Sequence, residues 1–348
     1  MFEALFLSNV ITLSLGLLMA LATPRRETFL LISVFSISIQ SVIIGLRNPG
    51  MMTDTREYAA LFEGTSGFED RIEPFFMALI YTFRQVTDSV GLFLIGVSVL
   101  INVIYFLILD IILRRYALLA FGLFSSTFSY WLIHVQLIRN GLACVLLLLA
   151  IVLIVNGKLR RGLVFFVLAL GNHFSIAVIS IGAFLGYTLS EFNFRRFFAI
   201  LSLMVGAYMI YEYALPTVPS LAPWKQRLDA YEYYNRNSFI SSSFGYIYAY
   251  FLLIVVGFPL LWRRHCNVEK VLFYIYISVA ALSFVFWFNI LFRDRIFLFA
   301  QIMEPILIAL VAKNGLGRRD GAFVVFGFSI LASLLVIYVW GPRTVLVF

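Results

Sequence analysis

Apolar stretches long enough to cross a bilayer follow one another along almost the whole chain. A membrane-spanning helix needs about 17–25 mostly apolar residues. Stretches of this length lie near residues 4–22, 28–46, 90–113, 116–133, 139–156, 197–215, 243–262, 271–291, 296–312 and 322–340. A further stretch, 162–190, is too long for one untilted span and is interrupted at Gly171, Asn172 and His173, so we expect two short helices there. The pattern predicts an all-α polytopic membrane protein with about 12 transmembrane helices.

Two amphipathic segments predict additional helices that lie along the outer surface of the membrane rather than across it. The segment 73–87 has its apolar residues at helical spacing. These residues are Phe76, Leu79, Ile80, Phe83 and Val86. The segment 224–237 opposes a charged stripe to an aromatic one, and Arg227 falls among the aromatic residues. We expect both segments to be interfacial helices, and we expect Arg227 to need an anionic partner.

The basic residues predict the orientation of the chain, because short loops rich in Lys and Arg face the cytoplasm. Such loops occur at Arg25-Arg26, Arg114-Arg115, 158–161, Arg195-Arg196, 263–270 and 313–319. Placing all of them inside leaves both termini, the segments 47–89 and 216–242, and the joint 293–295 outside. We expect the two outer segments to cover an extracytoplasmic cavity.

Composition supports one membrane domain over residues 1–348. The chain is 62% hydrophobic and 13% charged, whereas soluble domains are about half apolar and a quarter charged. The net charge of +8 belongs to the membrane loops, since no basic run on a soluble segment indicates nucleic-acid binding. The first apolar stretch lacks a basic region before it, so we interpret it as the first membrane helix and not as a cleaved signal. The two cysteines suggest neither a disulfide nor a metal site.

Acidic residues in the first outer segment are candidates for proton transfer. Asp54 and Thr55 are typical of a helix start, where an acid stabilises the amide end. Glu73 stands before Pro74 and is open to the same interpretation. The alternative is that either carboxylate faces a polar cavity and accepts a proton.

Five arginines are predicted on the outer side, against the usual charge bias: Arg47, Arg139, Arg227, Arg293 and Arg295. Taken singly, each could reach lipid headgroups, and Arg293 or Arg295 could pair with Asp294. Together they favour a phosphate or pyrophosphate ligand, because the planar guanidinium binds phosphate oxygens in pairs. His173, at the interruption of 162–190, is either a satisfied core residue or a base. No Asp-x-Asp motif and no His/Cys cluster indicates a metal.

At these residues the sequence resembles the EpsG family of bacterial polysaccharide polymerases, which are Wzy-type enzymes. The matching blocks are Arg47 with Asp54-Thr55 and Tyr58, Glu73 to Phe76 with Leu79, Arg139 to Ala143, His173 with Ser175, and Arg293 with Arg295. They extend from about residue 47 to 300. The chain differs from the family pattern at Met52-Thr53, Asn140 and Asn172.

The resemblance implies a GT-C-like polymerase architecture and a glycosyltransferase of the bacterial inner membrane whose active site faces outward. It would need no metal and no cofactor, and it would transfer an undecaprenyl-pyrophosphate-linked glycan to another lipid-linked repeat unit. Arg139, Arg293 and Arg295 would hold the donor pyrophosphate, assisted by Arg47 or Arg227. The base would be Asp54, Glu73 or His173, and Tyr58, Asn140 and Asn172 would contact substrate. A flippase and a chain-length regulator would be partners by analogy.

Two other classes of membrane protein use similar groups. A flippase or transporter for a lipid-linked glycan also needs arginines near a headgroup, but it must expose them to both sides of the membrane. No internal repeat in the sequence supports a transporter. An O-antigen ligase or a membrane acyltransferase is the second alternative, because a single outer histidine would suit either.

Overall fold

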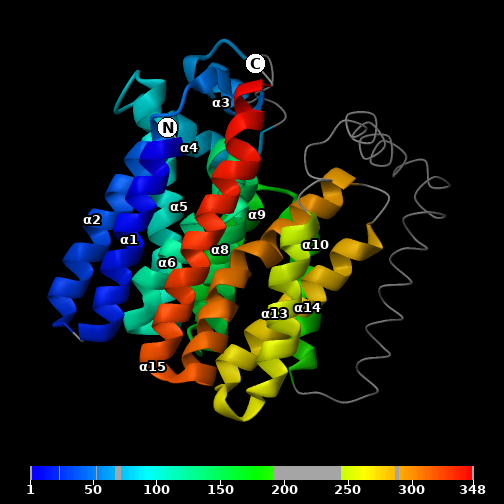
Figure 1. The fold of residues 1–348 in the computed structure, drawn as a ribbon. Coiled ribbons are helices and arrows are strands. Elements are labelled where there is room, and N and C mark those ends of the chain that lie inside the picture. Colours follow the sequence, from blue (N-terminus) through cyan, green and yellow to red (C-terminus); the bar gives the residue numbers. More distant parts are fainter. Residues whose placement is uncertain are drawn as a thin grey trace. The chain divides into compact units, whose positions relative to one another are not determined.

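The computed structural model describes residues 2–22, 24–51, 53–66, 72–190, 244–286 and 290–346 (Figure 1). Within these ranges every regular element is a helix. The chain forms two compact units: residues 1–174 with 308–348, and residues 175–307. We describe each unit by itself. The expected span 197–215, the amphipathic segment 224–237 and Arg227 lie outside the described residues.

Four long apolar helices of the first unit confirm the sequence prediction. They are α1 (Phe2–Ala22), α2 (Arg26–Gly45), α5 (Val90–Leu113) and α8 (Ile138–Val155). Helix α8 is buried along almost its entire length and packs against α5, α7 and α9. It ends at Gly157, whose φ of 76° is a conformation that other residues rarely adopt. Arg139 lies in the first turn of this buried helix.

The expected span 116–133 is not one continuous helix. A 3₁₀ turn, η3 (Arg114–Tyr116), leads into α6 (Ala117–Ser125), and α7 (Phe128–Val135) follows after a break. The Thr127 hydroxyl accepts a hydrogen bond from the Tyr130 amide at 3.3 Å, which caps the start of α7. The sequence prediction treated this region as plain apolar chain and missed the capping residue.

Two short helices precede α5 and confirm a helix in the segment 73–87. Helix α3 (Thr53–Glu63) follows the 3₁₀ turn η1 (Pro49–Met51), and α4 (Pro74–Arg84) begins with proline at its first position. Arg84 at the end of α4 donates a 2.7 Å hydrogen bond to the carbonyl of Phe62, which joins α4 to α3. Phe76 and Ile80 are fully buried, but Val86 lies beyond the helix and is 81% exposed, so it does not belong to the buried face.

The apolar stretch 162–190 forms two helices, as expected. These are α9 (Leu159–Asn172) in the first unit and α10 (Ser175–Leu189) in the second. The chain is extended at His173, with φ −160° and ψ 132°. Helix α9 packs against α4 so closely that a methyl group on Gly171 would overlap the Phe75 ring.

The second unit contains α10, α13 (Phe244–Leu260), α14 (Asn267–Val285) and the first part of α15 (Ile290–Leu346). The 3₁₀ turn η7 (Trp262–Arg264) joins α13 to α14. Helices α10 and α14 pack against each other. Both α13 and α14 correspond to expected apolar stretches.

Helix α15 is divided by Gly317, which has φ 82° and ψ 178°, so its two halves match the expected stretches 296–312 and 322–340. Arg318, just after this turn, donates to the carbonyls of Ala20 and Leu21 at 2.7 and 2.9 Å. These carbonyls belong to the last turn of α1 and have no partner within that helix. The second half of α15 is thereby attached to the first unit.

Among the described residues, 5 helical stretches are long and apolar enough to cross a membrane. They are Glu3–Ala22, Arg26–Gly45, Val90–Ser125, Ile138–Val155 and Arg293–Leu334. The fold is therefore that of an all-helical polytopic membrane protein. The total of about 12 spans and the GT-C-like arrangement remain predictions.

Candidate functional site

Arg139 is the centre of a polar cluster in the first unit. Its Nη1 atom forms an ion pair with Oε2 of Glu73. Its Nε donates to the Tyr58 hydroxyl at 3.1 Å, and its guanidinium carbon lies 5.6 Å from the centre of the Tyr58 ring. Three segments, at residues 58, 73 and 139, therefore meet at one guanidinium group.

Local structure explains how each of these side chains is held. Tyr58 lies on the buried face of α3, and its ring packs 5.3 Å from that of Phe76 in α4. Glu73 directly precedes α4 in an extended conformation, because a residue before proline avoids the helical region. The α3–α4 pair thus presents a hydroxyl and a carboxylate to the start of α8.

Glu73 also uses its second oxygen. Oε1 accepts a 3.2 Å hydrogen bond from the backbone amide of Phe174, the residue after the extended His173. Glu73 therefore links α4, Arg139 and the end of α9 at the same time. A carboxylate whose two oxygens are both occupied is better suited to positioning Arg139 than to accepting a proton.

Asp54 lies in the first turn of α3, as the sequence predicted. Its carboxylate is close enough to Arg139 to interact with it electrostatically. The hydroxyl of Thr55, the next residue, donates to the carbonyl of Val135 and so docks the start of α3 on the end of α7. Asp54 is half-buried, as Glu73 is.

Arg47 is a second cation of this unit, and it lies just after α2. It is 4% exposed; its Nη1 donates to the carbonyl of Ile44 at 2.9 Å, and its Nε has no partner among the described residues. Burial lowers the pKa of Arg47 to about 9, an effect that the nearby Tyr130 partly offsets. The group is therefore still protonated at neutral pH, and a buried cation of this kind favours an anionic ligand.

Two residues near Arg47, Tyr130 and His134, were not identified from the sequence. Both belong to α7, are fully buried, and interact electrostatically with Arg47. The Tyr130 hydroxyl accepts a 3.2 Å hydrogen bond from the Asn102 side chain. Burial and the neighbouring guanidinium favour the neutral form of His134. The signal that could have identified Tyr130 and His134 is the presence of polar side chains at the end of an otherwise apolar stretch.

The expected substrate contacts Asn140 and Asn172 are both buried. Asn140 follows Arg139 and accepts a hydrogen bond from the Cys144 thiol at 3.7 Å. The Asn172 amide donates to the carbonyl of Leu168 at 2.7 Å, and its Oδ1 has no partner among the described residues. His173 is 7% exposed at the break between α9 and α10. Its backbone adjoins the Phe174 amide that Glu73 binds, which associates His173 with the cluster.

Arg293 and Arg295 lie in the second unit, near the start of α15. Arg293 pairs with Asp294, with Nε and Nη2 at 3.0 and 2.9 Å from the same carboxylate oxygen. Pairing of Arg293 with the neighbouring Asp294 is one of the alternatives that the sequence analysis named. Oδ2 of Asp294 is buried and has no hydrogen-bond partner among the described residues. A meeting of these arginines with Arg139 remains a prediction, and Arg227 falls within the residues that are not described.

The cluster around Arg139 can bind an anion and transfer a proton. It combines a positioned guanidinium, a phenol hydroxyl, a carboxylate that holds the guanidinium and a second carboxylate that interacts with it electrostatically. Phosphoryl oxygens are the ligands that a guanidinium fork and a phenol donate to most readily.

Comparisons with known proteins give one match. The model of the EpsG family matches residues 29–344, which include all the predicted site residues. A search of curated proteins and a search of solved structures each found no match. The matched region includes almost the whole chain, so the resemblance seen in the motifs is confirmed. With its long apolar helices, the chain is a membrane protein of polysaccharide biosynthesis that belongs to the EpsG family.

Proposed function

We propose that this protein is a glycosyltransferase that polymerises lipid-linked oligosaccharide repeat units at the outer face of the bacterial inner membrane. The donor is a glycan on undecaprenyl pyrophosphate, and the acceptor is a second lipid-linked unit. Membership of the EpsG family and the apolar helices support the general class of function.

The observation that carries the proposal is the convergence of Tyr58, Glu73 and Arg139. A charged side chain at the end of a membrane helix has an energetic cost and is usually retained for a ligand or a pathway. Here three separate segments position the same guanidinium. Asp54 stands beside it as a second acid. The arrangement suits a diphosphate next to a general base.

In the proposed reaction the acceptor hydroxyl oxygen bonds to the anomeric carbon of the donor sugar. The bond between that carbon and the diphosphate oxygen breaks, and the lipid diphosphate leaves with the electron pair. Asp54 takes the proton of the hydroxyl. Arg139, oriented by Glu73 and Tyr58, stabilises the charge that develops on the leaving group. We assign Arg47, Arg293 and Arg295 to the same diphosphate.

The test is chain elongation by purified protein supplied with lipid-linked repeat units from a strain that lacks it. We expect Arg139→Ala to reduce the rate by about 100- to 1,000-fold, the range seen when a group that stabilises transition-state charge is removed. Arg160→Ala is the matched control, because Arg160 is an exposed arginine at the start of α9. Equal elongation by Arg139→Ala and the native protein would remove the proposal.

The same variant in cells separates a polymerase from a flippase. Loss of a polymerase leaves single repeat units on the outer leaflet, whereas loss of a flippase leaves them on the inner leaflet. We expect cells that carry Arg139→Ala to accumulate single repeat units on the outer leaflet. Accumulation of the repeat units on the inner leaflet would indicate that the cluster around Arg139 serves transport.

A further inference from the structure

Exposed arginines gather at one end of the first unit, the end that the basic loops predict to be cytoplasmic. They form three pairs, here called the inner arginine patch: Arg25-Arg26, Arg114-Arg115 and Arg318-Arg319. The end of α1, the start of α2 and the turn within α15 lie together at the lower end of Figure 1. The cations of the patch outnumber the acids of the same segments, which are Glu27, Asp110 and Asp320. The surface therefore carries a net positive charge.

Contacts between helix ends bring the three pairs together. Arg26, in the first turn of α2, forms an ion pair with Asp110, and its Nη1 lies 2.7 Å from Oδ1. Asp110 is one turn before Arg114, which directly follows α5, so the first and second pairs are neighbours. The Tyr116 hydroxyl donates to the carbonyl of Arg318, which joins the second pair to the third. The patch is therefore one surface and not three separate loops.

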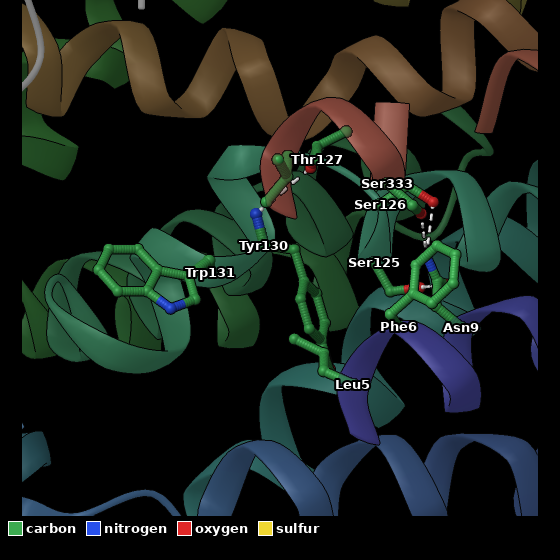
Figure 2. Close-up of a pocket in the computed structure, with 10 residues that line it drawn as sticks. Leu5, Phe6, Asn9, Ser125, Ser126, Thr127, Tyr130, Trp131 and Ser333 are labelled. Carbon is green, nitrogen blue, oxygen red and sulfur yellow. Dashed lines mark hydrogen bonds between the residues drawn. The ribbon is translucent and has the colours of Figure 1, made fainter. Parts of the chain in front are cut away.

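The helix that follows the third pair is attached to α1 at two places. Arg318 donates to two carbonyls in the last turn of α1. Near the other end of α1, the Asn9 side chain donates a 2.8 Å hydrogen bond to the hydroxyl of Ser333 (Figure 2). These contacts fix the second half of α15 along α1, so the position of Arg319 in the patch is set before any ligand binds.

Three arginines of the patch are available to a ligand. Arg114, Arg115 and Arg319 form no ion pair and no side-chain hydrogen bond within the part of the chain that the structure describes. Arg114 has φ 52° and ψ −112°, a conformation that glycine adopts far more readily than arginine. Strained backbone of this kind is concentrated at binding and functional positions. The bias of inner loops toward Lys and Arg explains the number of cations, but it explains neither their convergence nor this strain.

Apolar side chains are exposed directly beside the patch on α2, α5 and α15. They are 40% to 73% exposed and lie within two turns of an arginine of the patch: Leu31, Leu107, Ile111, Phe323 and Val324. A ligand at this place meets guanidinium groups at the helix ends and a hydrocarbon-facing surface next to them. A phospholipid has a counterpart for both, whereas an acidic protein segment has none for the apolar side chains.

We propose that the inner arginine patch binds the headgroup of an anionic phospholipid that carries two phosphates. The guanidinium groups at residues 114–115 bind one phosphate and Arg319 binds the other. The acyl chains lie along the exposed apolar side chains of α5 and α15. The bound lipid joins the inner end of α5 to the turn of α15. The site shares no residue with the Arg139 cluster and goes beyond the proposed function, because it needs neither a glycan nor a lipid-linked donor.

The test is lipid binding by the full chain purified in detergent, measured by native mass spectrometry. The probe is cardiolipin, which has two phosphates, and the reference lipid is zwitterionic phosphatidylcholine. We expect the native protein to bind cardiolipin more tightly. The Kd for cardiolipin should rise about tenfold or more in a triple variant, because each cation near a lipid phosphate contributes to binding. The variant combines Arg114→Gln, Arg115→Gln and Arg319→Gln.

A matched triple variant separates the patch from net charge. It removes three exposed cations before and in the first turn of α9, through Lys158→Gln, Arg160→Gln and Arg161→Gln. We expect it to bind cardiolipin as the native protein does. Equal losses in the two triple variants would show that only net charge matters and would overturn the proposal. Equal affinity of the native protein for cardiolipin and phosphatidylcholine would also overturn it.

Arg114→Gly gives a second test that does not depend on the folding of a triple variant. Glycine adopts a φ of 52° readily, so we expect the melting temperature in detergent without cardiolipin not to fall. The Kd for cardiolipin should rise about threefold or more, because one phosphate-binding guanidinium is lost. A lower melting temperature together with an unchanged Kd would assign Arg114 to the fold alone and contradict the proposal.

Discussion

At the scale of single residues, the two acids near Arg139 have different surroundings and should have different roles. Both oxygens of Glu73 are occupied, one by Arg139 and one by the Phe174 amide. Asp54 lies in the first turn of α3 and interacts with Arg139 electrostatically. The sequence could identify both carboxylates, but it could not assign their roles, because those depend on contacts with residues 66 and 101 positions away.

Asp54→Asn and Glu73→Gln should therefore affect different kinetic constants. Asp54→Asn removes the proton acceptor, and we expect kcat to fall about 100-fold or more. Glu73→Gln keeps an acceptor for Phe174 but weakens the hold on Arg139, so we expect mainly a higher KM for the lipid donor. Steady-state elongation across pH 5 to 9 measures both. The reverse pattern would exchange the two roles.

Arg47 gives a prediction at high pH. Burial lowers its pKa to about 9, so its charge, and any affinity for diphosphate that depends on it, is present below pH 9 and is lost as the pH rises through that value. We expect the KM for the lipid donor to increase above pH 9 in the native protein. Arg47→Met should have a higher KM at pH 7 and no further increase of this kind. If KM depends on pH in the same way in the native protein and in Arg47→Met, Arg47 does not take part in donor binding.

At the scale of elements, the sequence located most helices, because the lengths of the apolar stretches and the polar residues that interrupt them indicate where helices begin and end. It placed the break near His173 and the helix α4, and it missed the break between α6 and α7. Ser125, Ser126 and Thr127 contain no glycine or proline, and the break is stabilised by a threonine cap and by Asn9 from α1. A contact 116 residues away cannot be read from local pattern.

The packing of α9 on α4 yields a test of stability. Gly171→Ala would place a methyl group in the Phe75 ring, and we expect a loss of about 1–3 kcal/mol from the free energy of unfolding. Combining it with Phe75→Ala should restore part of that loss, because the ring is the obstacle. The measurement is thermal unfolding in detergent. Gly327→Ala in α15 is the control, since nothing lies within 4 Å of its position and alanine favours a helix.

At the scale of the whole molecule, the prediction that matters most is the side on which the polar residues lie. Periodicity and basic loops give the side and depth of a residue, but they do not give its neighbours around the helix axis. The sequence therefore predicts five arginines on the outer side, but it does not indicate which of them touch Glu73. Only Arg139 does so among the described residues.

Thiol labelling can test the orientation with a reporter that the chain already contains. Cys266 is exposed next to the basic loop at residues 263–264, whereas Cys144 is buried. We expect an impermeant maleimide to label Cys266 only after the membrane is permeabilised. Glu63→Cys in a Cys266→Ser background adds a thiol at the exposed end of α3, and we expect labelling in intact cells. The opposite result for both thiols would place the Arg139 cluster in the cytoplasm.

The turn at Gly317 shows how one position can affect a helix contact far from it. Its positive φ with a ψ of 178° is a conformation that only glycine adopts readily, and the space around it is open, so another residue there would meet backbone strain of about 1–3 kcal/mol and no collision. The helix that leaves this turn carries Ser333 to Asn9, roughly 24 Å along its axis. A substitution at Gly317 should therefore disturb the contact of α15 with α1 at Ser333 and Asn9, and not only the turn itself.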